Sequence, residues 1–296
     1  MDLVSSQTAN ILVGNSRNQP VMELHFPSSV FLFEQDALIA ITGADFTPAI
    51  NENEISTQQP IIVSRNSILQ FKKWKQGARC YLAIKEKLEL PQWLNSYSTN
   101  LKAGVGGNQG RALQKDDRIS LAEKNDYAVF LKNKNHIALP WKAGMNANAD
   151  AGKIFVLPGN EWAWLSENSR KEFSEQIFTI SASADRMGYR LLGNLTSENK
   201  QELVSSAVNF GTIQLLPNGE MIILMADHQT TGGYPRIAHV ITAHLPLVAQ
   251  MRASDKIQFQ FVIQQEAENL IVQQEHHLQQ LENACKFKLQ QYLGRG

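Results

Sequence analysis

Short apolar runs separated by polar, turn-forming clusters dominate the chain from Val21 onward. β-branched and aromatic residues fill the runs, and Pro, Gly, Asn and Ser separate them, which is typical of an antiparallel sandwich or barrel. The pattern therefore predicts a mainly β chain with few helices. The predicted strands span 21–26, 30–33, 37–42, 60–63, 68–71 and 79–84, and then 117–121, 127–131, 136–139, 153–157, 176–181 and 256–263.

Four stretches show helical spacing of their apolar residues. A short helix is expected to end at Gly14, and a second is expected over 166–175 with Ser166 as its N-cap. A third is predicted from Pro235 to Leu245, since proline fits the first helical turn. From Gln264 onward an apolar stripe predicts a C-terminal amphipathic helix that packs on the body of the protein, in preference to a coiled-coil partner helix.

These patterns divide the chain into three parts. We expect an N-terminal β-rich subdomain over 1–125, a C-terminal β subdomain over 126–263 that carries the main motifs, and the amphipathic helix over 264–296. A loop rich in hydroxyls, amides and glycine is expected over 95–110. Its glycines neither follow a clear strand nor open a helical pattern, so a dinucleotide-binding motif is excluded by context.

A predicted hairpin leads the chain into its most unusual stretch. The Asn-Gly pair within Pro217-Asn218-Gly219 is a strong hairpin signal between strands at 209–216 and 220–226. The stretch from Met225 to Pro235 follows this hairpin and precedes the predicted helix. It is therefore interpreted as a strand-to-helix junction, with the N-terminus of the helix pointing at the adjacent glycines.

The junction combines two glycines with side chains that titrate or form hydrogen bonds. Ordering Gly-Gly costs backbone entropy and buried polar groups need partners, so the composition favours a ligand site, although turn and cap chemistry alone also selects Thr, Gly and Pro. Amides at the glycines and the helix N-terminus suit an anion. We predict catalytic roles for Asp227, His228, Thr230 and Thr231, and substrate or anion binding for Gln229, Gly232, Gly233 and Tyr234.

A second polar cluster lies ahead of the hairpin, between Asp185 and Leu191. Arg186 and Arg190 can supply charge-assisted, bidentate hydrogen bonds beside a glycine that lets backbone approach. The alternative interpretation is a tight turn with Arg186 in a surface ion pair. Arg186, Tyr189 and Arg190, together with Gln214 in the first hairpin strand, complete the predicted substrate- and anion-binding set.

The composition limits the classes of function. The 296 residues carry 28 basic and 28 acidic side chains, so no global field favours nucleic acid or an anionic membrane surface. Apolar runs are too short to span a membrane and the start has no signal-peptide pattern, so a cytoplasmic protein is expected. The two cysteines, Cys80 and Cys285, have no ligand spacing around them. Neither a metal site nor a disulfide framework is predicted.

Several long motifs, in order and spacing, resemble one family. They are Ser183-Ala-Asp185-Arg-Met-Gly-Tyr-Arg-Leu191, the segment 202–206, Gly211-Thr-Ile-Gln214 and the stretch from Leu224 to Pro235. Weaker matches in the first half are Ala9-Asn-Ile-Leu-Val-Gly-Asn15, Ile41-Thr-Gly-Ala-Asp45, Gly77-Ala-Arg-Cys-Tyr-Leu-Ala83, Ser96-Tyr-Ser-Thr99 and Gly107-Asn-Gln-Gly-Arg111. The chain resembles the allophanate hydrolase subunit 2-like family, also called the KipA or biotin-dependent carboxyltransferase-like family.

This resemblance implies a cyclophilin-like β-barrel architecture and a protein that works with partners. Its first functional implication is the C component of an ATP-dependent 5-oxoprolinase, which opens 5-oxoproline to glutamate beside a KipI-like B component and a lactam-utilisation A component, with ATP shared among them. The second is a carboxyltransferase of the urea or allophanate type, with biotin arriving on another protein. The third is a non-catalytic KipA-like regulator that binds a KipI-like kinase inhibitor.

The departures from the family pattern also carry expectations. The chain is expected to be N-terminally short, because a stretch with a Thr-x-x-Asp-x-Gly-Arg-like motif usually precedes the segment that matches Met1. His228 stands where arginine is common in the family, so Asp227 ranks above it as a proton-handling group. Tyr97 and Ser254 are smaller departures, in a Ser-Arg-Ser-Thr motif and in place of a glycine.

Overall fold

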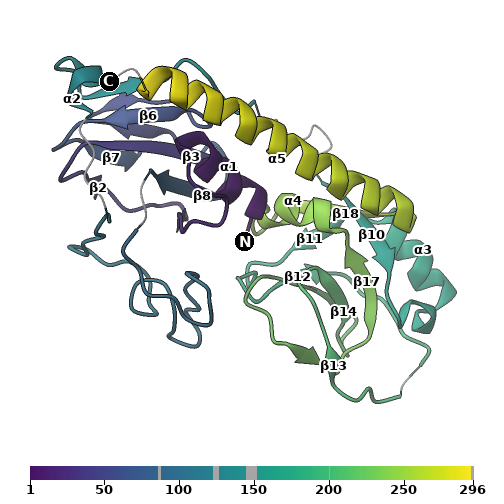
Figure 1. Cartoon of the computed structure of the whole chain (residues 1–296). Coiled ribbons are helices and arrows are strands. Elements are labelled where there is room, and N and C mark those ends of the chain that lie inside the picture. The colour runs from purple at the N-terminus through teal and green to yellow at the C-terminus, as the bar shows by residue number, and fades with distance from the viewer. Residues whose placement is uncertain (86–87, 123–126, 145–151, 200, 295–296) are drawn as a thin grey trace. The chain divides into compact units, whose positions relative to one another are not determined.

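The structure is a computed structural model that describes residues 1–85, 88–122, 127–144, 152–199 and 201–294 (Figure 1). The chain folds into two compact units. Unit 1 comprises Met1–Asp2 and Asn146–His277, and unit 2 comprises Leu3–Met145 and Leu278–Gly296. The long C-terminal helix α5 (Gln264–Leu293) thus contributes its first part to unit 1 and the remainder to unit 2.

Unit 1 is built around a closed seven-stranded barrel. The strand order is β10-β17-β14-β15-β12-β11-β18, and all neighbours are antiparallel except β10 and β18, which pair in parallel. The barrel strands are β10 (Lys153–Pro158), β11 (Phe178–Ile180), β12 (Gly188–Leu192), β14 (Thr212–Leu215), β15 (Met221–Leu224), β17 (Arg236–Val240) and β18 (Lys256–Phe261). Closure gives every barrel strand a hydrogen-bonded neighbour on both sides, so the barrel has no unpaired edge strand.

The other elements of unit 1 are short. They are the 3-10 helix η1 (Trp162–Trp164), helix α3 (Glu167–Glu175), strand β13 (Ser206–Ala207), strand β16 (Thr231–Gly232), the 3-10 helix η2 (Thr242–His244) and helix α4 (Leu245–Ala249). Ser166 caps α3, as predicted, by accepting a hydrogen bond from the backbone of Ser169 at 3.1 Å. Phe173 of α3 stacks on Phe259 of β18 with ring centroids 4.7 Å apart, which anchors this helix on the barrel.

Unit 2 contains two sheets. The first has the strand order β1-β8-β3-β6-β9 and the second β2-β7-β4-β5. Their bounds are β1 (Met22–Leu24), β2 (Phe31–Leu32), β3 (Ala37–Asp45), β4 (Pro48–Ile50), β5 (Asn53–Glu54), β6 (Pro60–Val63), β7 (Ile68–Phe71), β8 (Gln76–Ile84) and β9 (His136–Ala138), with helices α1 (Leu3–Val13) and α2 (Ala128–Leu131).

The central strand β3 is apolar on both faces because both faces are covered. Leu38 and Ala40 belong to a core cluster that includes α1 and Leu289 of α5. Ile39 and Ile41 point the other way, into a cluster with residues of the second sheet. The alternation of side chains along a strand therefore divides one continuous apolar run between two cores.

The prediction of a mainly β chain with a C-terminal helix is confirmed, and most strand positions agree. The strand predicted at 127–131 is wrong, because this stretch forms helix α2. The strand predicted at 117–121 is also wrong, since Leu121 forms only an isolated bridge with Leu88. Among the described residues, no helix is both long and apolar enough to cross a membrane.

The helix predicted from Pro235 to Leu245 is the most important error. Residues 236–240 form strand β17, which pairs with β14 on one side and β10 on the other. The β-branched residues Ile237, Val240 and Ile241 fit helical spacing but also favour a strand. Backbone hydrogen bonds from two flanking strands decide the outcome. Pro246 lies in the first turn of α4, the position that proline favours in a helix.

Candidate functional site

The stretch from Met225 to Pro235 connects two barrel strands. It leaves β15, forms β16 outside the barrel and returns as β17. β16 pairs antiparallel with β13, and the amide of Val208 extends this pairing by donating to the carbonyl of Thr230 at 3.1 Å. We call residues 225–235 the rim loop. The 206–208 segment therefore anchors the second half of the rim loop, and residues 229–231 in its middle are exposed.

No helix begins at the rim loop, so one part of the predicted anion site is wrong. The predicted helix N-terminus behind Gly232 and Gly233 is replaced by strand β17, and the next helical segments, η2 and α4, begin only at Thr242 and Leu245. A strand carries no macrodipole comparable to that of a helix, because its peptide dipoles alternate. Any anion bound at the rim loop would therefore depend on side chains and individual amides.

Arg186 and Asp227 form a two-point polar contact near the start of the loop. Arg186 Nε donates to Asp227 Oδ2 at 2.9 Å and Nη2 donates to Oδ1 at 3.1 Å, which is a bidentate, charge-assisted pair. The backbone amide of Asp227 also donates to the carbonyl of Arg186 at 2.8 Å. Asp185 fixes the turn by accepting from the amides of Met187 and Gly188. Arg186 thus forms an ion pair, as the alternative interpretation of this turn expects. Its partner is the carboxylate of Asp227, for which a catalytic role was predicted.

Tyr189 and Arg190 do not share this contact. Tyr189 is 2% exposed in the barrel core, where its hydroxyl donates to the carbonyl of Met251 at 3.2 Å. Arg190 lies on the exposed face of β12, and its Nη1 is 3.7 Å from a carboxylate oxygen of Glu220. Neither residue is brought to the carboxylate of Asp227, and Tyr189 is placed as a core residue.

Gln214 lies buried beneath the second half of the loop. A register shift in the β14–β17 pairing occurs at Ile213 and Gln214, and such bulges redirect side chains. The Gln214 amide donates to the carbonyl of Tyr234 at 3.3 Å, whereas its Oε1 has no hydrogen-bond partner among the described residues. A Cβ added to Gly232 would lie 2.6 Å from Gln214 Nε2. A side chain at this position would displace the amide end of the Gln214 side chain.

A second bidentate pair, Glu161 with Arg236, lies where the loop enters β17. Arg236 Nε and Nη2 donate to the Glu161 carboxylate at 2.9 and 2.7 Å, and the backbone amide of Arg236 adds a third bond at 2.9 Å. Burial of Glu161 acts to raise its pKa, but the hydrogen bonds and charge of Arg236 outweigh burial, so the pKa is lowered. No local motif in the sequence marks this pair, because 75 residues separate its members.

The middle of the loop is open to solvent. Gln229, Thr230 and Thr231 are exposed, and Tyr234 is 44% exposed. His228 contacts the carbonyl of Gln229 through Nδ1, and a carbonyl can only accept, so Nδ1 carries the proton. In the neutral ring Nε2 is then an acceptor.

The rim loop can therefore offer an oriented carboxylate, an imidazole nitrogen, and hydroxyl and amide groups to a small polar substrate. The two arginines at its ends, Arg186 and Arg236, are each engaged by a carboxylate. Among the described residues, no group of three His, Cys, Asp or Glu side chains could hold a metal ion. The arrangement suits hydrogen bonding and proton transfer.

Comparison with known proteins decides the family. The model of the carboxyltransferase domain, subdomain A and B, matches residues 1–261. The chain belongs to this carboxyltransferase domain family. The resemblance recognised in the sequence motifs is thereby confirmed, and the family match includes both the rim loop and the sheets of unit 2.

Two curated members of the carboxyltransferase domain family are similar over nearly the whole chain. The C subunit of the Haemophilus influenzae 5-oxoprolinase is 37% identical over 284 residues, which cover 95% of this chain and 87% of that protein. The C subunit of the Escherichia coli 5-oxoprolinase is 31% identical, with the same coverage of both chains. The crystal structure of the Kluyveromyces lactis urea carboxylase matches 96% of this chain and 26% of that chain with a TM-score of 0.84 and 24% identity, which shows a shared fold.

Proposed function

We propose that this carboxyltransferase-family chain is the C subunit of an ATP-dependent 5-oxoprolinase, which opens 5-oxoproline to glutamate together with a KipI-like and a lactam-utilisation partner. The observation that carries the proposal is the 37% identity to the C subunit of a 5-oxoprolinase over 95% of the chain. The rim loop supports it, because its exposed groups suit a small molecule with a carboxylate and an amide.

The reaction breaks the ring C–N bond of the lactam. Water supplies the oxygen of the new carboxylate, and the ring nitrogen becomes an amine that must receive a proton. A lactam carbonyl is a poor electrophile, and transfer of the terminal phosphoryl group of ATP to its oxygen, with release of ADP, would activate the carbon toward water. Cleavage of the C–N bond would then leave an acyl phosphate, and a second water would release phosphate from it and complete the carboxylate.

The rim loop alone does not provide a binding site for a nucleoside triphosphate. The two arginines at its ends are held by Asp227 and Glu161, and the helix N-terminus expected to bind phosphate is replaced by β17. We therefore assign nucleotide binding to the partner subunits. This chain's own contribution is to bind and orient the lactam.

Five side chains of the rim loop have roles in this proposal. The Asp227 carboxylate, held in place by Arg186, accepts the N–H of the lactam and thereby orients the ring. Thr230, Thr231 and Gln229 bind the substrate carboxylate with hydroxyl and amide donors. His228 Nε2 lies on the same loop and can pass a proton to the leaving nitrogen when the ring is protonated.

A reconstituted complex tests the proposal. The chain is co-expressed and co-purified with candidate KipI-like and lactam-utilisation partners, and 5-oxoproline-dependent release of ADP and glutamate is measured for the wild type and for Asp227→Ala. We expect coupled release that the substitution abolishes. An intact complex without turnover would contradict the proposal, and binding to the KipI-like partner alone, unchanged in Asp227→Ala, would favour a regulatory role.

Carboxyl transfer is a second candidate, favoured by the family description that matches residues 1–261. In this reaction carboxybiotin on another protein donates its carboxyl group to an amide or urea nitrogen. The same groups of the rim loop would then orient the acceptor nitrogen. Addition of a biotin carrier whose carboxyl group is isotopically labelled, together with an amide acceptor, to the same complex separates the two reactions, because only carboxyl transfer moves the label into an N-carboxylated product.

A further inference from the structure

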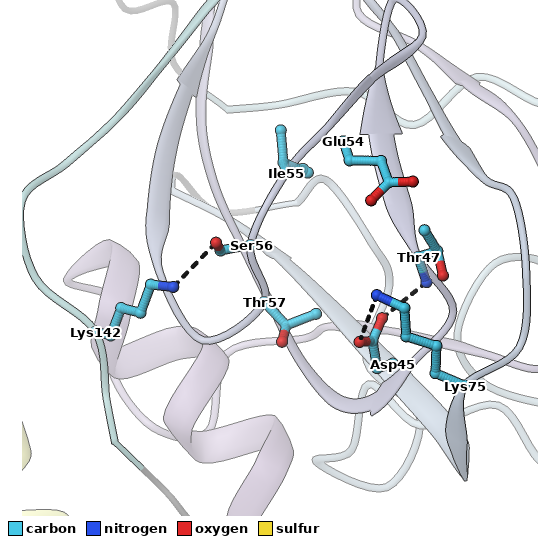
Figure 2. A pocket seen from close by; sticks show the side chains of 8 residues that line it. All are labelled: Asp45, Thr47, Glu54, Ile55, Ser56, Thr57, Lys75 and Lys142. Atoms are coloured by element: carbon cyan, nitrogen blue, oxygen red, sulfur yellow. Dashed lines mark hydrogen bonds and ion pairs between the residues drawn. The ribbon is translucent and has the colours of Figure 1, made fainter.

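Unit 2 contains a polar pocket that the proposed function does not use. Its volume is about 340 Å³, at the small end of the range for small-molecule sites (Figure 2). Asp45, which lines the pocket, is the last residue of the motif Ile41-Thr-Gly-Ala-Asp45. The proposed function gives this motif no role. Its lining residues are Asp45, Thr47, Glu54, Ile55, Ser56, Thr57, Lys75 and Lys142.

The backbone bends sharply at the wall of this pocket. The β3–β8 register shifts between Gly43 and Asp45, so β3 is bulged where it reaches the pocket. Thr47 follows with φ 52°, a conformation that β-branched residues rarely adopt. Its amide donates to Asp45 Oδ1 at 2.8 Å and its hydroxyl donates to the carbonyl of Lys73 at 2.9 Å. These bonds hold a costly conformation in place, as is common at ligand sites.

The pocket presents two ammonium groups and two carboxylates. Lys142 and Lys75 enter it from opposite sides, with Ser56 and Thr57 between them (Figure 2). Lys142 donates to the neutral hydroxyl of Ser56 at 3.0 Å, and Lys75 Nζ lies 3.6 Å from Asp45 Oδ2. Within the part of the chain that the structure describes, no ion pair engages Lys142 or Glu54. Both therefore have charge available for a ligand.

The two ammonium groups and the two carboxylates have a net formal charge of zero. This balance favours one class of ligand over others. A polyanion such as a triphosphate would face two carboxylates, and a cation would face two ammonium groups. A small zwitterion satisfies both signs when its ends are oriented correctly. Ile55 adds an apolar surface against which a short carbon chain can pack.

We propose that this pocket binds a small zwitterion of the α-amino acid type. Its carboxylate lies at Lys142 and Ser56, and its ammonium group lies at Glu54 and Asp45. The proposal is independent of the proposed function, because it requires only binding within unit 2 and no group of the rim loop.

Calorimetric titration of the purified full-length chain tests the site. The probes are L-norvaline, a zwitterion with a short apolar side chain, pentanoate, which has the same carbon chain and carboxylate but no ammonium group, and inorganic phosphate. We expect L-norvaline to bind, and pentanoate and phosphate to bind at least about tenfold more weakly, because the loss of one charged contact at about 1.4 kcal/mol corresponds to a tenfold change in Kd.

Matched variants locate the binding. Lys142→Met and Glu54→Gln should each weaken L-norvaline binding about tenfold, whereas Lys134→Met, which removes an exposed lysine outside the pocket, should have no effect. Asp227→Asn should also leave the affinity unchanged. Equal affinity for L-norvaline and pentanoate, unchanged binding in both pocket variants, or no binding of L-norvaline would overturn the proposal. Unchanged thermal unfolding of the variants confirms that they are folded.

Discussion

Arg186 donates two hydrogen bonds to the carboxylate of Asp227 and so joins the turn before β12 to the loop after β15. The two residues are 41 positions apart in the sequence, and strand pairing between β12 and β15 brings them together. The bidentate geometry fixes the orientation of the carboxylate. The residue that we assign to substrate orientation is thus also part of a structural link.

A double-mutant cycle on this pair separates the two roles. Asp227→Asn and Arg186→Met should each lower the stability of the chain, and the double variant should lose less than the sum, with a coupling free energy of about 1–3 kcal/mol. Denaturant unfolding measures the coupling. In the reconstituted complex, Asp227→Asn should also reduce kcat by about 100-fold or more. Strictly additive stability losses would contradict the direct contact.

Gly232→Ala is expected to distort the rim loop. The new Cβ would lie 2.6 Å from Gln214 Nε2, so the buried amide must move, at a cost of about 1–3 kcal/mol. Gly233→Ala is the matched control, because its Cβ would find its nearest neighbour at 3.3 Å. Addition of Gln214→Ala to Gly232→Ala should relieve the clash. Thermal unfolding of these variants distinguishes overpacking from a general effect of replacing glycine.

The Glu161–Arg236 pair should contribute stability that is lost in acid. The pKa of Glu161 is lowered in the folded state, so its contribution is present above the reference value of 4.5 and disappears as the pH falls through the folded pKa. At pH 7, Glu161→Gln should cost about 3 kcal/mol, as expected for breaking a buried pair. Denaturant unfolding at pH 7, 5 and 4 should show that the difference in unfolding free energy between Glu161→Gln and the wild type becomes smaller as the pH falls. Glu198→Gln, at an exposed position, should show no such trend.

His244 should make unit 1 sensitive to mild acid. Its Nδ1 accepts a hydrogen bond from the amide of Phe155 at 3.1 Å, its ring stacks on Phe155, and burial lowers its pKa from 6.5. Below pH 6.5 the unfolded chain binds a proton that the folded chain resists, so stability falls by at most about 1.4 kcal/mol per pH unit. His244→Gln should flatten this dependence between pH 7 and 5. His277→Gln, on the exposed side of α5, should leave it unchanged.

Much of the fold was predictable because the signals are local. The Asn-Gly turn specifies the β14–β15 hairpin, Ser166 caps α3, and the apolar stripe after Gln264 forms α5. The composition of the rim loop also marks it as unusual in the sequence. These features depend on residues a few positions apart, so the sequence carries their full physical cause.

The candidate site was only partly predictable. Asp227 and Arg186 were both singled out, but their mutual pairing was not, and Tyr189 turned out to lie in the core. Glu161 gave no signal, since its partner Arg236 lies 75 residues away. Contacts of this kind depend on barrel closure, which no local pattern encodes.

By itself the amino-acid sequence determined the mainly β class, the hairpin, the terminal helix and the family, because periodicity, turn chemistry and motif spacing are properties of neighbouring residues. Only the tertiary structure decided that residues 236–240 form a strand. Their β-branched pattern fits a helix or a strand, and the free backbone groups of β10 and β14 settle the choice. The same long-range pairing also replaced the helix N-terminus of the predicted anion site with strand β17. The two arginines next to the rim loop, Arg186 and Arg236, each pair with a carboxylate.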